Sequence, residues 1–475
     1  MAGNVETLNG TAPHQTSLGA ITVKPASEAA EAPFCAREKF LPVTKASLMD
    51  RLTAPGRWPN HIQRDARRFF RYLDYWRQQQ YAMRLLGLIE AYEPFSPDTD
   101  LLVTRQYAPQ ERAALQKQVM SGAEQLLQQA NYTRIDPEKV NLIVTQDSAY
   151  GLDLSVDLAA FEEIAIYYRG VSNRKNSRRN MKKFFRKEEF EVPIFRRLCV
   201  VFKLVSFEDR VAKVMKDNGW SRKDAETHVK KLRSHLPAEV KEGNIYMKLF
   251  RNIPRTDIEM VFPNTQVRFR LKDKLRLGAT AGGGLGFGIF TSAGKVALLA
   301  SNPIGAVGAA LGLGGVAFRQ AMSFVNQKQK YMVVMAQNLY FLSMADNGSV
   351  IVELAARAAE EDIKEEWLLY SVLAKTGASR ADLPAIDRAI EKFLHAEFGV
   401  PVDFDVEDAL NRLIADGIVT ENADGTFNTL APKQAGLYID GKWDVLLDKL
   451  PDPGHSAGDE AISADDLVAQ ESLPA

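Results

Sequence analysis

Hydrophobic and polar positions along the chain change their spacing near residue 137. From residue 45 to 136, apolar side chains recur at helical spacing, with arginine and glutamine between them, as in Phe69, Phe70, Leu73, Tyr75 and Trp76. This spacing predicts helices that each pack one face into a core. Later apolar runs have a spacing near two and predict strands; they lie at residues 142–144, 164–168, 195–205, 245–250 and 267–271.

These patterns predict an α+β fold. A helical region at residues 45–136 precedes an α+β domain at 137–275. The small, mostly antiparallel sheet of this domain is interrupted by polar helices between residues 207 and 236. Further helices at 319–345 and 350–375 are expected to form a stem at 320–378.

A winged-helix-like unit is predicted at residues 379–450. Helical spacing at 386–398 and 405–416 is followed by a hairpin that turns at Asp424-Gly425. The helix at 405–416 carries mostly acids against Arg412, and basic side chains supply most of a protein's affinity for nucleic acid, so we expect no DNA binding. The chain ends, residues 1–44 and 451–475, have the composition of a disordered leader and a disordered acidic tail.

Residues 276–319 predict a glycine-rich transmembrane hairpin. Between Arg276 and Arg319 the only charge is Lys295, and the stretch holds twelve of the chain's 31 glycines. A span needs roughly 20 apolar residues, and two segments fit on either side of a polar break at 301–303. The second segment is short for a full span, so a glycine-rich pair buried in protein and a re-entrant insertion remain alternatives. Glycines that would let two helices pack closely recur at Gly278, Gly282, Gly286, Gly308 and Gly312.

Basic residues flank this hairpin on both sides. Arginines and lysines alternate from Arg268 to Arg276, and Arg319, Lys328 and Lys330 follow the second segment. Because positive charge accumulates on the cytoplasmic side of a membrane, the pattern predicts a two-span membrane protein with both termini in the cytoplasm or matrix.

Composition excludes several functional classes. Sixty basic and sixty acidic side chains give a net charge of zero, so a polyanion partner would have to bind a local patch. Cys35 and Cys199 are the only cysteines, which rules out a disulfide framework. No nucleophile, phosphate-loop or metal-ligand motif is present, and we expect no catalytic residues, no metal and no cofactor.

A basic run between Arg169 and Lys187 is the strongest local charge pattern. It contains no acid and includes Phe184-Phe185, a combination suited to an anionic lipid surface. A solvated loop between strands and an RNA site remain open as alternatives. The predicted lipid-facing patch consists of Arg174, Lys175, Arg178, Arg179, Lys182, Lys183, Arg186 and Lys187.

Three short segments resemble a known family. They are Tyr167-Tyr168-Arg169-Gly170, Ile194-Phe195-Arg196-Arg197-Leu198, and the run 245–263, which contains Lys248-Leu249-Phe250 and Asp257-Ile258-Glu259. Over residues 140–320 the chain resembles an uncharacterised domain-of-unknown-function family that includes transmembrane protein 143. The resemblance implies two membrane spans at the glycine-rich stretch, and it implies no reaction.

Strand alternation within 245–250 places Lys248 on one face with Tyr246 and Phe250. A half-buried lysine needs a carboxylate, and Asp257 and Glu259 are the nearest candidates. Two interpretations stay open: a structural ion network, and a site for a phosphorylated ligand or lipid headgroup. The residues predicted to take part are Arg169, Lys248, Arg251, Arg255, Asp257 and Glu259.

The leading hypothesis is a membrane-anchored, non-enzymatic scaffold or regulatory module. It would bind membrane lipid and a partner protein, or a second copy of itself, on one side of the membrane. Two alternatives from other classes remain. One is a membrane-surface enzyme acting on a lipid or phosphorylated metabolite, and the other is an oligomerising or pore-forming hairpin protein.

Overall fold

The computed structural model describes part of the chain between residues 37 and 446. The described residues are 37–100, 105–136, 153–180, 186–234, 236–255, 258, 261–263, 266–268, 322, 329, 333, 336 and 339–446. At 153–155, 174–180, 186–192 and 266–268 only the backbone is described. The predicted hairpin at 276–319, with its packing glycines Gly278, Gly282, Gly286, Gly308 and Gly312, lies outside these ranges.

A helical core forms around α10 (Gly348–Leu373), which contacts α1 (Lys45–Leu52), α2 (Asn60–Tyr92) and α3 (Pro109–Gln129). Trp367 of α10 is fully buried and packs against Phe70 of α2, with ring centroids 5.5 Å apart and the rings tilted by 31°. Its indole Nε1 donates to the Phe70 carbonyl at 3.1 Å, so this large ring is buried without an unsatisfied donor. Phe69, Phe70, Leu73 and Trp76 are therefore core, as their spacing predicts, whereas Tyr75 of the same stripe is 55% exposed.

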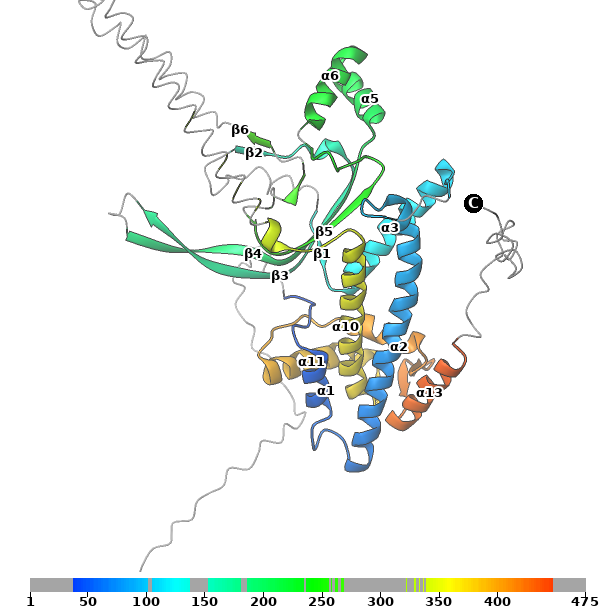
Figure 1. The fold of residues 1–475 in the computed structure, drawn as a ribbon. Helices are drawn as coiled ribbons and strands as arrows, with labels where there is room; N and C mark the ends of the chain where they lie inside the picture. Colours follow the sequence, from blue (N-terminus) through cyan, green and yellow to red (C-terminus); the bar gives the residue numbers. More distant parts are fainter. Residues whose placement is uncertain are drawn as a thin grey trace, which may run out of the picture. The chain divides into compact units, whose positions relative to one another are not determined.

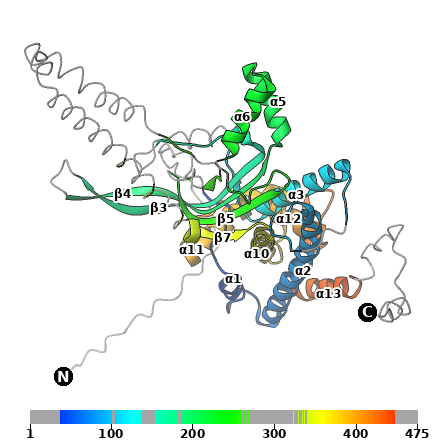
Figure 2. The ribbon, with the colours of Figure 1, turned by 45° about the horizontal axis from the view of Figure 1, so that its top comes forward.

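A five-stranded antiparallel sheet lies beside this core. The strand order is β1 (Thr133–Arg134), β3 (Phe161–Asn180), β4 (Arg186–Leu204), β5 (Ile245–Pro254) and β7 (Ser343–Asp346). Apolar residues of β3, β4 and β5 pack on α2, α3 and α10, and Figure 2 shows α10 beside β5 and β7. The predicted α+β class and antiparallel sheet are confirmed.

The polar segment between β4 and β5 forms two short helices, α5 (Phe207–Asn218) and α6 (Arg222–Arg233). Ser206 and Ser221 cap them by accepting the backbone N–H groups of Asp209 and Asp224. Gly219 ends α5 with a φ of 65°, a left-handed conformation that favours glycine. A separate pair of short strands joins β2 (Asp153–Ser155) to β6 (Gln266–Arg268).

Strands β3 and β4 continue beyond the sheet as a two-stranded arm (Figure 1). The pairing of β4 with β5 is last seen at Ile194 and Pro254, whereas β3 and β4 stay paired as far as Asn180 and Arg186. The described backbone of the basic run, residues 169–180 and 186–187, therefore lies in paired β-strands. Its lysines and arginines sit at fixed register positions along the two strands.

The C-terminal part contains α11 (Leu383–Phe398), α12 (Val406–Ala415) and α13 (Pro432–Asp444). A small sheet accompanies them, with the order β8 (Ala378–Ser379), β10 (Thr426–Thr429) and β9 (Val419–Glu421). Gly425 occupies the turn between β9 and β10 with a φ of 77°. A short 3-10 helix at Arg380–Asp382 leads into α11.

The helix predicted at residues 319–345 is wrong at its C-terminal end. The pattern predicts helix from 319 to 345, but Ser343–Asp346 forms β7 and pairs with β5. Short apolar segments fit either structure, and here the free edge of β5 supplies backbone partners that a helix cannot use. Among the described helices, none is both long and apolar enough to cross a membrane.

An arginine of α12 joins the C-terminal elements to the core. Arg412 is largely buried and contacts Glu365 of α10 at 2.5 Å, Glu366 at 3.0 Å and Asp362 at 3.2 Å. Arg77 of α2 contacts the same Glu366 oxygen at 2.7 Å. We call this set, together with Asp416, the buried ion cluster. It connects three helices that are far apart in the sequence.

Replacing Arg412 with Met should lower the free energy of unfolding by about 3–5 kcal/mol, because buried carboxylates lose their counter-ion. Urea denaturation measures the loss. Arg388→Met on the exposed side of α11 is the matched control and should change stability by less than about 0.5 kcal/mol. A loss below about 1 kcal/mol for Arg412→Met would show that Arg412 does not hold α12 in place.

Candidate functional site

Three arginines lie in one row across the middle strands of the sheet. Arg169 of β3 is opposite Arg197 of β4, and Arg197 is opposite Arg251 of β5. Directly opposite residues of neighbouring strands share a face, so all three belong to the face that packs on α10. The preceding row on that face is buried and apolar, with Cys199 and Leu249 at its centre. The sheet face thus changes from apolar to cationic within one row.

Arg169 is the most enclosed member of this arginine row. Its side chain is buried beside the ring of Phe40, 4.1 Å from the centroid, and that of Tyr132, 4.8 Å away. Its Nη1 donates to the Ala130 carbonyl at 3.0 Å. The two rings stabilise the guanidinium by cation–π attraction. This arginine therefore holds the N-terminal segment and the end of α3 against the sheet.

Gly170 permits the close packing next to this row. Its φ is 78°, and a Cβ at this position would come within 2.9 Å of the Cβ of Arg196. Any larger residue would push β3 away from β4. The glycine after the two tyrosines thus keeps Arg169 and Arg197 in register.

The other two members of the row are more accessible. Arg197 is partly buried and donates from Nη1 to the Arg196 carbonyl at 2.9 Å. Burial lowers its pKa, and the positive charges of Arg169 and Arg357 lower it further. Arg251 is exposed, and its Nε and Nη2 donate to the Phe341 carbonyl at 3.2 and 3.1 Å. Within the described part of the chain, no carboxylate forms an ion pair with any arginine of the row.

Lys248 does not join this row. It follows the alternation of β5 onto the opposite face from Arg251, where it pairs with Asp346 of β7 at 3.0 Å. Both side chains remain partly exposed, at 36% and 47%. The predicted partners Asp257 and Glu259 lie outside the described residues, so the carboxylate seen beside Lys248 is one that sequence analysis did not anticipate.

The predicted ion network is therefore divided between two faces. The structure brings Arg169 and Arg251 into one row and places Lys248 on the other face of the sheet. Arg255 follows the end of β5 and is partly buried. Arg197, which completes the row, was missed as a site residue. The available signal was an arginine inside an apolar strand, but only the register shows that three such arginines coincide.

The predicted lipid-facing patch lies along the arm. The strands contain Arg174, Lys175, Arg178, Arg179, Arg186 and Lys187, whereas Lys182 and Lys183 lie outside the described residues. Along the arm, Lys175 is opposite Glu191 and Arg178 is opposite Glu188, and the next pair joins Arg179 and Lys187. A glutamate therefore faces the basic residue at positions 175 and 178, whereas the last two described pairs, Arg179–Lys187 and Asn180–Arg186, contain no acid.

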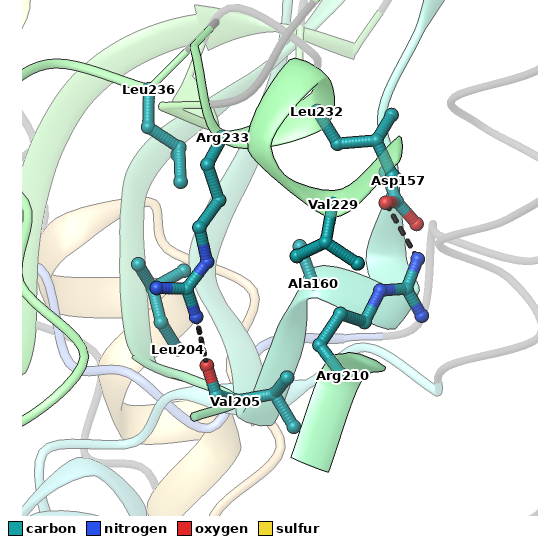
Figure 3. A pocket seen from close by; sticks show the side chains of 9 residues that line it. All are labelled: Asp157, Ala160, Leu204, Val205, Arg210, Val229, Leu232, Arg233 and Leu236. Atoms are coloured by element: carbon teal, nitrogen blue, oxygen red, sulfur yellow. Dashed lines mark hydrogen bonds and ion pairs between the residues drawn. The ribbon is translucent and has the colours of Figure 1, made fainter. Parts of the chain in front are cut away.

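A pocket beside α5 and α6 offers little chemistry (Figure 3). It is lined by Leu204, Val229 and other apolar side chains, with two arginines at its sides. Arg210 pairs with Asp157 at 2.8 Å, and Arg233 donates to the Val205 carbonyl at 2.8 Å. Both cations are engaged, and the pocket lies where α5 and α6 pack on the start of β3 and the end of β4.

The buried ion cluster contains a potential cation site. Oxygen atoms of Asp362, Glu365 and Asp408 lie within 4.8 Å of one another. The guanidinium of Arg412 already contacts all three residues. A metal ion would have to displace this arginine, so the cluster is better described as a carboxylate cage around a side-chain cation. Sequence analysis treated 350–375 as an ordinary stem helix and did not identify this cage.

Burial changes the proton affinity of the cage. It raises the pKa of Glu365 to about 8, although Arg412 opposes the shift. It also raises the pKa of Glu366 to about 7, against the attraction of Arg77 and Arg412. Four buried carboxylates, Asp362, Glu365, Glu366 and Asp416, face the guanidinium groups of Arg77 and Arg412, and the Lys442 ammonium lies 3.5 Å from Asp416. Burial favours the neutral forms of Glu365 and Glu366 within this set.

Stability should consequently fall as pH rises through neutrality. A carboxyl whose pKa is higher in the folded state stabilises the fold fully below its unfolded pKa, and this contribution disappears as pH rises through its folded pKa. For Glu365 and Glu366 the folded values are about 8 and about 7, so the melting temperature should decrease between about pH 6 and about pH 9. Thermal denaturation across this range measures the slope.

The variant Glu365→Gln should flatten this pH dependence, since it removes one titrating group while keeping an acceptor for Asn131. Glu407→Gln on the exposed side of α12 is the control and should leave the slope unchanged. A wild-type melting temperature that stays constant from about pH 6 to about pH 9 would contradict the protonated state of the cage.

Comparison with known proteins finds one family match, in the middle of the chain. Residues 161–349 match the model of a family described as a protein of unknown function, DUF3754. No solved structure matches the chain. The matched region begins at β3 and ends at the start of α10, and it includes the arginine row, the arm and the edge formed by β5 and β7. Residues 161–349 are therefore a DUF3754 domain, which confirms the expected domain of unknown function.

Proposed function

We propose that the protein is a membrane-anchored, non-enzymatic scaffold whose sheet domain faces an anionic membrane. In this proposal, residues 276–319 form the two-span anchor and both termini stay on the cytoplasmic or matrix side. The relationship to transmembrane protein 143 belongs to the same proposal. The two-span anchor rests on the lack of charge in this stretch and on its basic flanks.

The observation that carries the proposal is an exposed aromatic pair. Tyr340 and Phe341 are 79% and 63% exposed, and their rings meet edge to face with centroids 5.1 Å apart. They lie just before β7, on the C-terminal side of the apolar stretch 276–319. Adjacent exposed aromatic rings are costly in water but are enriched where proteins meet the membrane interface.

Cationic and apolar groups accompany the aromatic pair. Arg251 donates to the Phe341 carbonyl, and Met344 on β7 is 39% exposed. A guanidinium beside aromatic rings suits the headgroup region, where phosphates and acyl chains are both within reach. This edge of the sheet therefore has the mixed chemistry of a membrane-contacting surface.

The arm supplies a second contact. Its tip combines the basic residues near Arg179 and Lys187 with Phe184-Phe185 in the connecting sequence. Each basic residue near an anionic surface contributes about 1 kcal/mol of attraction. A scaffold role fits the remaining chemistry, because the buried carboxylates of the described core pair with cations and none of them lines a described pocket.

Carbonate extraction of membranes that contain the full chain tests the anchor. The protein should remain in the membrane pellet, because integral spans resist alkaline release whereas peripheral charge contacts do not. A variant lacking residues 277–318 should be released while keeping the circular dichroism and melting temperature of its folded core. Release of the full chain would contradict the proposal.

A further inference from the structure

We infer that the arginine row formed by Arg169, Arg197 and Arg251 is a binding site for a phosphate group. The inference deepens the proposed membrane function, because a lipid headgroup is one source of phosphate. A soluble phosphorylated compound is the other. Both present the same chemistry, a compact oxyanion that accepts hydrogen bonds from several donors.

The spacing of the row fits such an anion. Residues directly opposite each other on neighbouring strands have Cβ atoms about 4.5–5.5 Å apart, so Arg197 and Arg251 start from adjacent positions on one face. A phosphate oxygen pair can accept two parallel hydrogen bonds from one guanidinium, and a second guanidinium can engage the remaining oxygens. Arg169 lies behind them and adds positive potential from a buried position.

Two arginines of the row, Arg197 and Arg251, have N–H groups that could donate to a ligand. An arginine carries five N–H groups. The contacts of Arg197 use Nη1 alone, and those of Arg251 use Nε and Nη2 for a single carbonyl. Among the described residues, Nη2 of Arg197 and Nη1 of Arg251 have no protein acceptor. These two groups belong to the more accessible end of the row.

Other buried arginines of this chain have carboxylate partners, which the arginine row lacks among the described residues. Arg77 and Arg412 are about as enclosed as Arg169, the most buried arginine of the row, and both have carboxylates at 2.5 Å. The arginine row instead brings three cations together and leaves them without an ion pair in the described structure. Like charges placed directly opposite on neighbouring strands destabilise a sheet. A bound anion would remove this repulsion, which gives the row a use that a structural role does not provide.

The position of the row agrees with a membrane source. Arg251 at its exposed end contacts the backbone of Phe341, one of the two exposed aromatic residues. If the aromatic pair enters the interface, the guanidinium of Arg251 would lie at headgroup depth. A lipid phosphate would then reach Arg251 first and Arg197 next, while Arg169 stays inside the fold.

The test uses the purified full chain in detergent and three probes: inorganic phosphate, short-chain phosphatidic acid below its micelle concentration, and short-chain phosphatidylcholine. Calorimetric titration gives the affinities for wild type, Arg197→Gln and Arg251→Gln. Arg196→Gln is the matched control, because Arg196 is the exposed neighbour of Arg197 on the opposite face of β4.

Loss of a charged hydrogen bond should weaken binding about tenfold or more in Arg197→Gln and Arg251→Gln, with Arg196→Gln unchanged. Weakening for both phosphate and phosphatidic acid indicates a general phosphate site, and weakening for phosphatidic acid alone indicates a headgroup site. Either result supports the inference. No measurable binding to wild type, or equal weakening in all three variants, would overturn it.

Thermal denaturation separates binding from a structural role. Phosphate should raise the melting temperature of wild type and of Arg196→Gln but not that of Arg197→Gln. Without phosphate, Arg197→Gln should melt no lower than wild type, because the substitution relieves repulsion within the row. A lower melting temperature together with unchanged affinity would assign Arg197 a structural role. Carbonate extraction is independent of these results, so a failed phosphate site leaves the membrane anchor standing.

Discussion

The contact between Arg412 and the buried carboxylates of α10 is the constraint on which the described core depends. Glu365 and Glu366 are buried on all sides, and α12 supplies the guanidinium that compensates them. Arg77 of α2 shares the Glu366 oxygen, so one carboxylate joins elements that precede and follow the DUF3754 domain. Separating the two flanking regions would leave a buried charge unpaired, which costs several kcal/mol.

The N-terminal segment adds a second connection through the same helix. Lys364 of α10 donates to the Leu41 carbonyl at 2.7 Å, and Glu361 accepts the Leu41 backbone N–H at 2.9 Å. The carboxylate of Glu38 in this segment accepts the backbone N–H of Val171 on β3. The sheet with its arginine row is thus held to α10 by apolar packing and by these hydrogen bonds of the N-terminal segment.

The sequence predicted element types better than it predicted charge partners. Helical spacing placed α2 and α12 correctly, and strand spacing located β5, because both depend on local periodicity. The end of the stem helix was wrong, since β7 forms only where the edge of β5 is available. The arginine row depends on the register of three strands that are distant in sequence. No local pattern contains that register.

The burial of the carboxylate cage is another feature that the sequence did not predict. The sequence from Glu360 to Glu366 has the acidity of an exposed helix, yet Glu361, Asp362 and Glu365 are buried. Arg412 of α12 pairs with Asp362 and Glu365, Arg77 of α2 pairs with the neighbouring Glu366, and Lys364 of the same helix pairs with Glu361. The burial of these carboxylates therefore depends mainly on cations from two other helices. Long-range compensation of this kind cannot be read from a charge pattern, whereas burial of Phe69 and Phe70 follows from their hydrophobicity alone.

Depth-dependent quenching at residue 341 tests the central claim, that the aromatic edge of the sheet lies at the membrane. The chain carries Cys35→Ser, keeps Cys199, which is buried, and bears a fluorophore at Phe341→Cys or, for comparison, at Tyr438→Cys on α13. Both forms are reconstituted into vesicles that contain lipids with a nitroxide at a shallow acyl-chain position. The account predicts strong quenching at residue 341 and little at residue 438. Equal quenching at both positions, or none at residue 341, would contradict it.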